Sequence, residues 1–265
     1  MDSAQGSIGS AIERRRRGGA RLRNGDPVVG FMLASALSMD FVQFLTPQPD
    51  FVIVEMEHSH FAWPDVAACL RMLNLLGVLS LVRIPEISYS SVSLALDAGA
   101  DGVLVPRVRT PDEVERAVEA MLLPPHGGKG VGGYDFQVEP LAERIKHHDT
   151  DKLLLVQIEN STAVENLPQL LSVGRVAGLI VGPFDLSQSL GIPGDFENPR
   201  FAGAIETIVH AARGRGIAVG AMMPSASLGN AWRAIGMSIS WVGTEVSLFT
   251  SGWTEAHATV VGRAR

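Results

Sequence analysis

The stretch KLLLVQIENSTAVENLPQLLSVGRVAGLIVG, residues 152–182, decides the fold. Its two ends, 152–159 and 176–182, are apolar almost throughout, which is typical of parallel strands covered on both faces. Between them, residues 160–172 form a leucine-rich stretch of helical periodicity. The segment is therefore predicted to be one strand–helix–strand unit of a parallel sheet.

The same alternation continues along the chain in both directions from about residue 25. The apolar runs expected to be strands are 28–33, 51–57, 79–83, 102–106, 152–159, 176–182, 217–221 and 239–243. Helices are expected near 38–46, 63–76, 88–98, 111–121, 138–147, 160–172, 198–214, 225–236 and 251–263. Eight such repeats in 265 residues predict an α/β protein with a (β/α)8 TIM barrel. A doubly wound open sheet is the alternative.

The domain organisation follows from composition. No Pro/Ser-rich linker divides residues 20–265, so we expect a single (β/α)8 domain, a size that α/β barrels commonly reach. Residues 1–19 are expected to be a basic, flexible extension. Six arginines lie within 14–23, whereas the whole chain carries a net charge of −6. The body is therefore acidic, and nucleic acid is not expected as a partner.

The scarcity of cysteine and the lack of long apolar runs indicate the cellular compartment. Cys69 is the single cysteine, so no intrachain disulfide can form, and a reducing cytoplasmic location is expected. No apolar run approaches the ~18 residues of a membrane helix, so no membrane partner is expected. Hydrophobic residues make up 46% of the chain, which excludes intrinsic disorder.

Ionisable side chains and one amide stand where several predicted strands end. Catalytic groups of TIM barrels lie at the C-terminal ends of the strands. The residues at these positions are Glu55, Glu57, His58, Arg83, Gln157, Glu159 and Asp185. Because burying unpaired charge is costly, these groups are expected to neutralise one another, bind a cation, or both.

A metal site is expected at the ends of the fifth and sixth strands. Gln157 and Glu159 lie two residues apart on a strand, so both point into the barrel mouth, and Asp185 follows the adjacent strand. Two carboxylates form an oxygen-only site that suits Mg²⁺ or Mn²⁺. The alternative is that Glu159 caps the helix that starts near 160–162.

His58 and Arg83 are the other candidates for chemistry. His58 is flanked by Glu55 and Glu57, which could orient it as a general base; alternatively it is a surface histidine. Arg83 could stabilise a carboxylate or a developing enolate oxygen; alternatively it pairs with Glu55 or Glu57. Residues 128–133 match G-x-G-x-x-G, but no strand precedes them, so we expect a mobile flap beside the mouth instead of a nucleotide site.

Six ordered motifs resemble the metal-dependent (class II) pyruvate aldolases of the 4-hydroxy-2-oxoheptanedioate aldolase family, which includes 2-dehydro-3-deoxyglucarate aldolase. The resemblance runs from about residue 21 to 262. Its motifs are Glu57-His58, 81–83, 97–100 with 104–106, Pro124-Pro125 before the glycine-rich loop, 156–159, and 182–187. It implies a phosphoenolpyruvate/pyruvate-type barrel, a C-terminal segment near 246–261 exchanged between subunits, and a hexamer built as a trimer of dimers.

The resemblance also implies roles for individual residues. Glu159 and Asp185 would hold a divalent cation (Mg²⁺ or Mn²⁺, with Co²⁺ as a further candidate) that chelates a pyruvate-like substrate, without an organic cofactor. Arg83 would stabilise the enolate oxygen, and His58 would act as base, beside Glu55 and with Asp97 from a neighbouring subunit. The residues implied to line the substrate site are Gln157, Arg83, Gly182, Pro183, Phe184, Asp185 and Met222.

The chain also departs from the family pattern. Glu55 stands where members usually carry Asp, and Lys129 where the glycine-rich loop usually has Arg. Phe184 replaces a smaller residue, and with Met222 and Met223 it suggests a more apolar acceptor pocket.

The expected function is reversible cleavage of a 4-hydroxy-2-oxo acid to pyruvate, or a close 2-oxo acid, and an aldehyde, through a metal-bound enolate. The physiological aldehyde is left open. Oxaloacetate decarboxylation or transfer of the enolate to another electrophile is the alternative on the same site. A barrel that binds metal and oxo acid without turnover is the second alternative.

Overall fold

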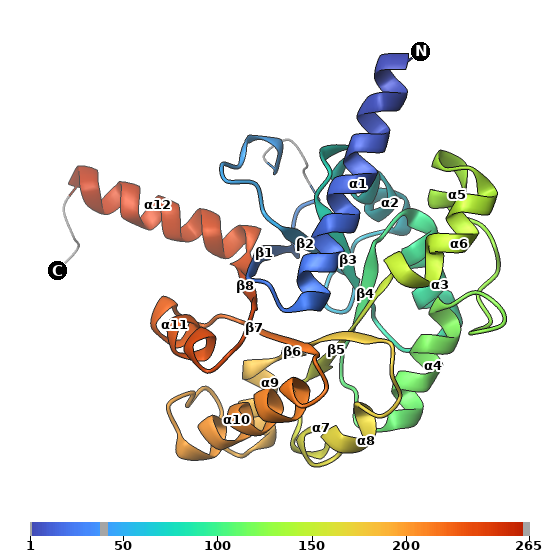
Figure 1. Ribbon diagram of the computed structural model, residues 1–265. Helices are drawn as coiled ribbons and strands as arrows, with labels where there is room; N and C mark the ends of the chain where they lie inside the picture. Colours follow the sequence, from blue (N-terminus) through green and yellow to red (C-terminus); the bar gives the residue numbers. More distant parts are fainter. Residues whose placement is uncertain (1, 38–41, 262–265) are drawn as a thin grey trace.

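The computed structural model describes residues 2–37 and 42–261, and its core is a closed barrel of parallel strands (Figure 1). The strands are β1 Val28–Leu33, β2 Phe51–Glu55, β3 Leu79–Arg83, β4 Gly102–Val105, β5 Leu153–Ile158, β6 Val176–Val181, β7 Ala218–Met222 and β8 Ile239–Thr244. They are hydrogen-bonded in sequence order, and β8 pairs with β1. The prediction of a TIM barrel is confirmed, and the open sheet is excluded.

Two apolar layers stabilise the barrel because strand side chains alternate in direction. Residues such as Ile53, Leu81 and Leu155 point inward and form a compact core. Val52 and Val82, one position away, point outward and pack beneath the surrounding helices. The outer layer explains why the strand sequences are nearly continuous in apolar residues.

Helices cover most of the outside of this barrel, and of those that follow β1 in the described residues only the last extends away from it (Figure 1). Their bounds are η1 Val42–Phe44, α2 Trp63–Leu76, α3 Tyr89–Ala98, α4 Pro111–Met121, α5 Asp135–Val138, α6 Leu141–Asp151, α7 Ser161–Glu165, α8 Leu167–Leu170, α9 Pro183–Ser189, α10 Pro199–Arg213, α11 Ala226–Ala234 and α12 Glu245–Val261. Most lie where they are expected. The helix expected at 160–172 is divided at Asn166, just before Pro168, and of the one expected at 38–46 only η1 falls within the described residues. The short α9 is not among the helical stretches expected from periodicity, whereas the family resemblance implies a helix start at Phe184 and Asp185.

The arginine-rich segment forms α1, Asp2–Asn24, and its C-terminal half closes the floor of the barrel. Leu22 is fully buried among the inward-pointing residues. The buried Arg15 pairs with Asp101, and Arg16 lies 2.8 Å from both Glu139 and Asp151. The structure therefore differs from the expected flexible extension, because these carboxylates neutralise arginines on one side of the helix. The N-terminal half of α1 projects beyond the barrel (Figure 1).

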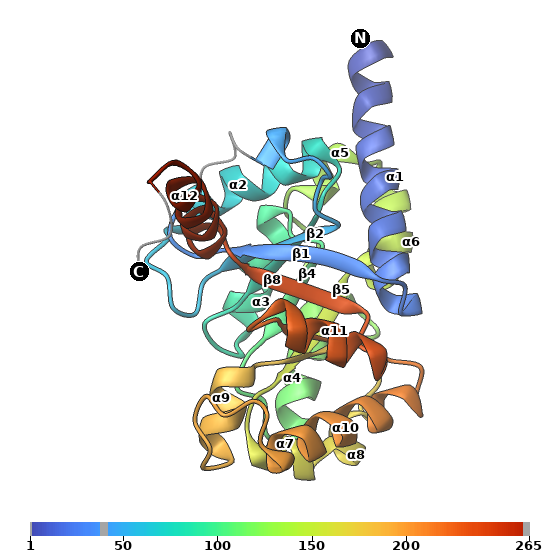
Figure 2. The same ribbon diagram turned by 90° about the vertical axis from the view of Figure 1, so that its left-hand side faces the viewer.

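At the other end of the chain, α12 extends away from the barrel (Figures 1 and 2). None of its described residues is buried, although Phe249 and Trp253 are large and apolar. Its first residue is anchored: the Glu245 carboxylate accepts hydrogen bonds from the backbone N–H groups of residues 34–36, in the loop after β1. No helix within the described ranges is long and apolar enough to cross a membrane.

A buried histidine on α6 predicts acid sensitivity of the fold. His148 is 1% exposed, with Nε2 3.1 Å from the Met121 carbonyl oxygen. Burial, and then the charge of Lys152, lower its pKa to about 4. The neutral ring therefore stabilises the fold above the ordinary histidine pKa, and this stability is lost as pH falls from about 6.5 towards 4, by at most about 3 kcal/mol.

Urea unfolding at a series of pH values checks this expectation. His148→Gln should flatten the decline in the free energy of unfolding between pH 6.5 and 4. His147→Gln, on the same helix but more exposed, is the control and should keep it. A wild-type slope in the His148→Gln profile would contradict the assignment.

Candidate active site

A cavity of about 540 Å³ opens at the C-terminal mouth of the barrel. Side chains expected from the sequence form much of its wall: His58, Arg83, Gln157, Gly182, Pro183, Phe184, Asp185 and Met222. Met223, Trp241 and the beginning of α12 complete it. The mouth of the barrel therefore brings together most of the candidate residues from β2, β3, β5, β6 and β7.

The side chains of Gln157 and Glu159 lie together at the end of β5. Gln157 Nε2 donates a hydrogen bond of 2.5 Å to Glu159 Oε2. Both groups are buried and face Gly182, where a Cβ would lie 2.7 Å from Gln157 Nε2 and from Glu159 Oε2. A larger residue at position 182 would therefore clash with these side chains. The backbone itself does not require glycine, because a φ of −91° suits any residue.

Burial raises the pKa of Glu159 to about 7. The backbone N–H of Arg107, 2.6 Å from Glu159 Oε1, opposes this shift. The negative charges of Asp185 and then Glu57 raise the pKa further. Glu159 and Asp185 therefore lie close enough for their charges to repel, and a bound cation would relieve this repulsion.

The donor set fits a hard divalent cation that keeps several waters. Within residues 2–37 and 42–261, no group of three or more His, Cys, Asp or Glu side chains is placed to hold a metal. Mg²⁺ and Mn²⁺ do not need such a group, because one or two carboxylates, waters and substrate oxygens complete their shell. In the described part of the chain, the buried Gln157 Oε1 has no hydrogen-bond partner, so this cavity contains an acceptor ready for a bound water or ligand.

Arg83 is held by carboxylates from the neighbouring strand. Its Nε lies 2.5 Å from Glu55 Oε2 and 3.4 Å from Glu57 Oε2. Its guanidinium lies 5.8 Å from the Trp241 ring centroid. Burial raises the pKa of Glu57, and the positive charge of Arg83 opposes that shift. The ion pair considered from the sequence therefore exists, and it fixes Arg83 at the cavity wall.

His58 reaches the cavity from the turn after β2. Glu55 Oε1 accepts hydrogen bonds from the backbone N–H groups of Glu57 and His58, so Glu55 shapes the turn and does not touch the imidazole. His58 Nε2 lies 3.7 Å from Glu57 Oε2, and the side chain is 70% exposed. The imidazole is therefore free to meet a substrate or a neighbouring subunit at the mouth.

Arg107 is a site residue that the sequence analysis misses. It follows β4, and its Nε lies 2.8 Å from Glu57 Oε1, while its backbone N–H donates to Glu159. Its φ of 58° is left-handed, a conformation that costs a non-glycine residue energy. Arg107 could have been predicted as a candidate, because it is a charged residue directly after the strand expected at 102–106.

Asp97 lies on α3 and outside the cavity wall of its own chain. Its Oδ1 is 2.6 Å from Nζ of Lys129, which is 1% exposed. The glycine-rich loop at 128–133 is therefore tied to α3 through this ion pair. Of the two residues, the cavity of the single chain is lined by His58 and not by Asp97.

The comparisons with known proteins agree with this geometry. Residues 30–251 match the family described as HpcH/HpaI aldolase/citrate lyase. A 2-keto-3-deoxy-L-rhamnonate aldolase from Escherichia coli O17:K52:H18 is 31% identical over 233 residues, 87% of each chain. The structure of an HpcH/HpaI aldolase from Desulfitobacterium hafniense superposes with a TM-score of 0.82 at 28% identity, covering 93% of this chain and 98% of that one. A family member from Burkholderia cenocepacia gives a TM-score of 0.82 at 27% identity, covering 91% and 98%.

Proposed function

Because the chain belongs to the HpcH/HpaI aldolase/citrate lyase family, we propose that it is a divalent-metal-dependent aldolase. It reversibly cleaves a 4-hydroxy-2-oxo acid into pyruvate, or a close 2-oxo acid, and an aldehyde. The observation that carries this proposal is a cavity lined by Arg83, Gln157 and Asp185, in which Gln157 donates a hydrogen bond to the buried Glu159 carboxylate. The Escherichia coli relative, named for a 2-keto-3-deoxy sugar acid, supports this substrate class.

The carboxylates of Glu159 and Asp185 would hold Mg²⁺ or Mn²⁺, with the amide of Gln157 beside them. When bound, the cation polarises the 2-oxo group of the substrate and so acidifies the neighbouring C–H bonds. The guanidinium of Arg83, fixed by Glu55, stabilises the negative charge that develops on the enolate oxygen. The positive charge of Arg83 is in position before the reaction, so the site needs little rearrangement when the enolate forms.

Proton transfer is assigned to His58. Imidazole is the side chain best suited to accept and return a proton near neutral pH. In cleavage, His58 takes the proton of the 4-hydroxyl group as the C3–C4 bond breaks, which releases the aldehyde and leaves an enolate, and the proton is then delivered to C3 of the enolate to give pyruvate. In the reverse direction a base removes a methyl proton of pyruvate, and the new C4 alkoxide takes up a proton from His58. Asp97 of a neighbouring subunit would assist it, and Lys129 would orient that carboxylate.

The aldehyde half of the substrate would meet an apolar wall. Phe184 is 55% exposed at the cavity and packs edge-on against Phe196, with ring centroids 5.4 Å apart. Met222 at the end of β7 and Trp241 on β8 line the same cavity. We therefore expect aldehydes with apolar surface to be accepted better than strongly polar ones.

The test is deuterium exchange at the methyl group of pyruvate, followed by pyruvate release from several 4-hydroxy-2-oxo acids. Exchange reports enolate formation without an acceptor aldehyde. We expect both activities to need Mg²⁺, Mn²⁺ or Co²⁺ and to be lost with EDTA. Metal-independent turnover would contradict the mechanism, and oxaloacetate decarboxylation without exchange or cleavage would favour the alternative activity.

We propose a cytoplasmic location. Cys69 is buried, and burial raises the pKa of its thiol to about 12. A single, unreactive thiol is in keeping with a reducing compartment.

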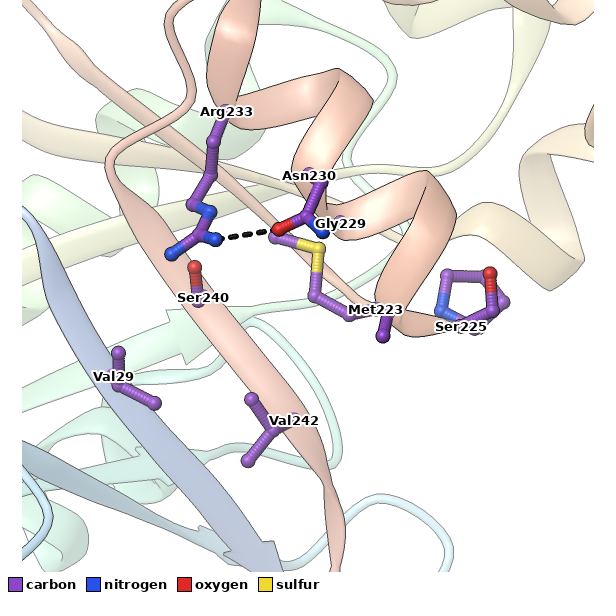
Figure 3. A pocket seen from close by; sticks show the side chains of 10 residues that line it. Val29, Met223, Ser225, Gly229, Asn230, Arg233, Ser240 and Val242 are labelled. Atoms are coloured by element: carbon purple, nitrogen blue, oxygen red, sulfur yellow. Dashed lines mark hydrogen bonds between the residues drawn. The ribbon is translucent and has the colours of Figure 1, made fainter.

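The assembly is proposed to be a hexamer, a trimer of dimers, in which subunits exchange α12. In a TIM barrel the last helix covers the outside of β8 and β1. Here that surface is a groove of about 440 Å³, with Val29 and Val242 exposed at its floor and Arg233 at its edge (Figure 3). The unburied α12 of a second copy offers the apolar side chains to fill it.

Light scattering checks this assembly. Phe249→Glu and Trp253→Glu should lower the mass towards that of smaller species, because each places a charge on an apolar contact. Arg116→Glu on α4 is the control and should leave the mass unchanged. A monomeric wild-type protein would contradict both the exchange and the role of Asp97.

A further inference from the structure

A second cavity, of about 420 Å³, lies at the opposite end of the barrel from the mouth. It is bounded by the ends of α1, α4 and α6 and by the beginnings of β5, β6 and β7. Arginines from three separate parts of the chain line it: Arg23, Arg175 and Arg215. We call this the basal cavity.

Arg23 is half-buried at the end of α1. Its Nη2 donates a hydrogen bond of 2.9 Å to the Lys152 carbonyl oxygen. Burial lowers its pKa; the charge of Asp151 opposes this, and the positive charge of Arg175 lowers the pKa further. Arg23 and Arg175 therefore lie close enough to repel each other.

Arg175 has a backbone conformation that disfavours its side chain. Its φ is 64°, directly after Gly174 with a φ of 75°. Within the described residues, the only other non-glycine residue with positive φ is Arg107, at the mouth. The backbone therefore carries a cost at the position that places the Arg175 guanidinium in the wall of the cavity.

Arg215 completes the cationic wall. Its Nη1 donates a hydrogen bond of 2.9 Å to the Leu171 carbonyl oxygen, which holds the guanidinium in place. Across the ranges 2–37 and 42–261, none of the three arginines forms an ion pair.

The remaining charged groups of the basal cavity are already engaged. Asp149 accepts hydrogen bonds from the Leu123 backbone N–H and binds His126 Nδ1 at 2.8 Å. Lys152 Nζ pairs with Asp135. The cavity therefore carries excess positive charge on a chain whose net charge is −6.

We propose that the basal cavity binds a small metabolite with at least two negative charges, held through phosphoryl or carboxylate oxygens. Planar guanidinium groups match both kinds of oxyanion with paired hydrogen bonds. A bound dianion would offset the repulsion between Arg23 and Arg175. Its binding energy would also compensate for the strained backbone conformation of Arg175. Its binding is independent of the aldolase chemistry proposed at the mouth.

Calorimetry on the metal-free full-length protein tests this proposal. The probes are inorganic phosphate and 3-phosphoglycerate for phosphoryl groups, and tricarballylate for carboxylates. Potassium chloride at equal ionic strength is the control for screening. We expect saturable binding of one of the two classes and none of chloride; failure of all three probes to bind would overturn the proposal.

Arg175→Gly separates binding from folding. Glycine suits the left-handed backbone, so the variant should be as stable as the wild type, while affinity for the anion falls about tenfold or more. Arg215→Met should weaken binding similarly, and Arg116→Gln, on an exposed face of α4, should not. Pyruvate release by Arg175→Gly without added anion should equal that of the wild type. Anion binding that survives Arg175→Gly but is lost in Arg83→Gln, which removes a cation from the mouth, would place the anion there and overturn the proposal.

Discussion

Replacing Glu159 with glutamine is expected to lower pyruvate release by about a thousandfold, because loss of a metal ligand removes several kcal/mol of charge stabilisation. Glutamine keeps the volume of the side chain and an oxygen that can accept the Arg107 N–H bond seen at 2.6 Å. The change therefore removes charge with little change in shape. Steady-state rates over a series of Mn²⁺ concentrations measure the effect.

The control for this substitution is Glu165→Gln, on the exposed side of α7. It should keep wild-type activity and Mn²⁺ affinity. Calorimetric titration with Mn²⁺ alone distinguishes a metal ligand from a structural residue, since Glu159→Gln should lose binding and still unfold cooperatively. Wild-type Mn²⁺ binding by Glu159→Gln would contradict the assignment.

Arg83→Lys is expected to slow deuterium exchange at pyruvate about a hundredfold or more, mainly through kcat. Lysine keeps the positive charge that Glu55 and Glu57 require but lacks the planar fork. It can therefore neutralise the carboxylates or reach the developing enolate oxygen, but not both.

Arg109→Lys, at an exposed position after β4, is the matched control and should exchange at the wild-type rate. Thermal unfolding should show that Arg83→Lys is folded. An unchanged kcat with only a raised KM would mean that Arg83 binds the ground state instead of stabilising the enolate.

The barrel could be predicted from sequence because parallel strands buried on both faces have a strong local signal. The strand expected at 28–33 coincides with β1, and the one at 79–83 with β3. The order of α1 could not be predicted in this way. It depends on Arg15 meeting Asp101, 86 residues away in sequence, and no local pattern encodes such a pair.

In the candidate site, too, some features could be predicted from local sequence and others depend on contacts in the folded chain. Glu159 and Asp185 follow predicted strands, so the topology alone brings them to one end of the barrel. The role of Arg107 depends on a left-handed backbone and on a side chain that reaches from the end of β4 to Glu57 after β2. Both are properties of the folded chain, and neither appears in the spacing of residues.

The anchoring of Glu245 to the loop after β1 separates two functions of the C-terminal helix. Glu245, the first residue of α12, links the end of β8 to the loop after β1. The turns of α12 that extend away from the barrel come after this residue. If the later turns of α12 move when another subunit binds or leaves, the movement therefore starts after Glu245. Residues 34–36 of the rim stay tied to Glu245, whereas Ser247 and Ser251, which also line the cavity, move with the helix.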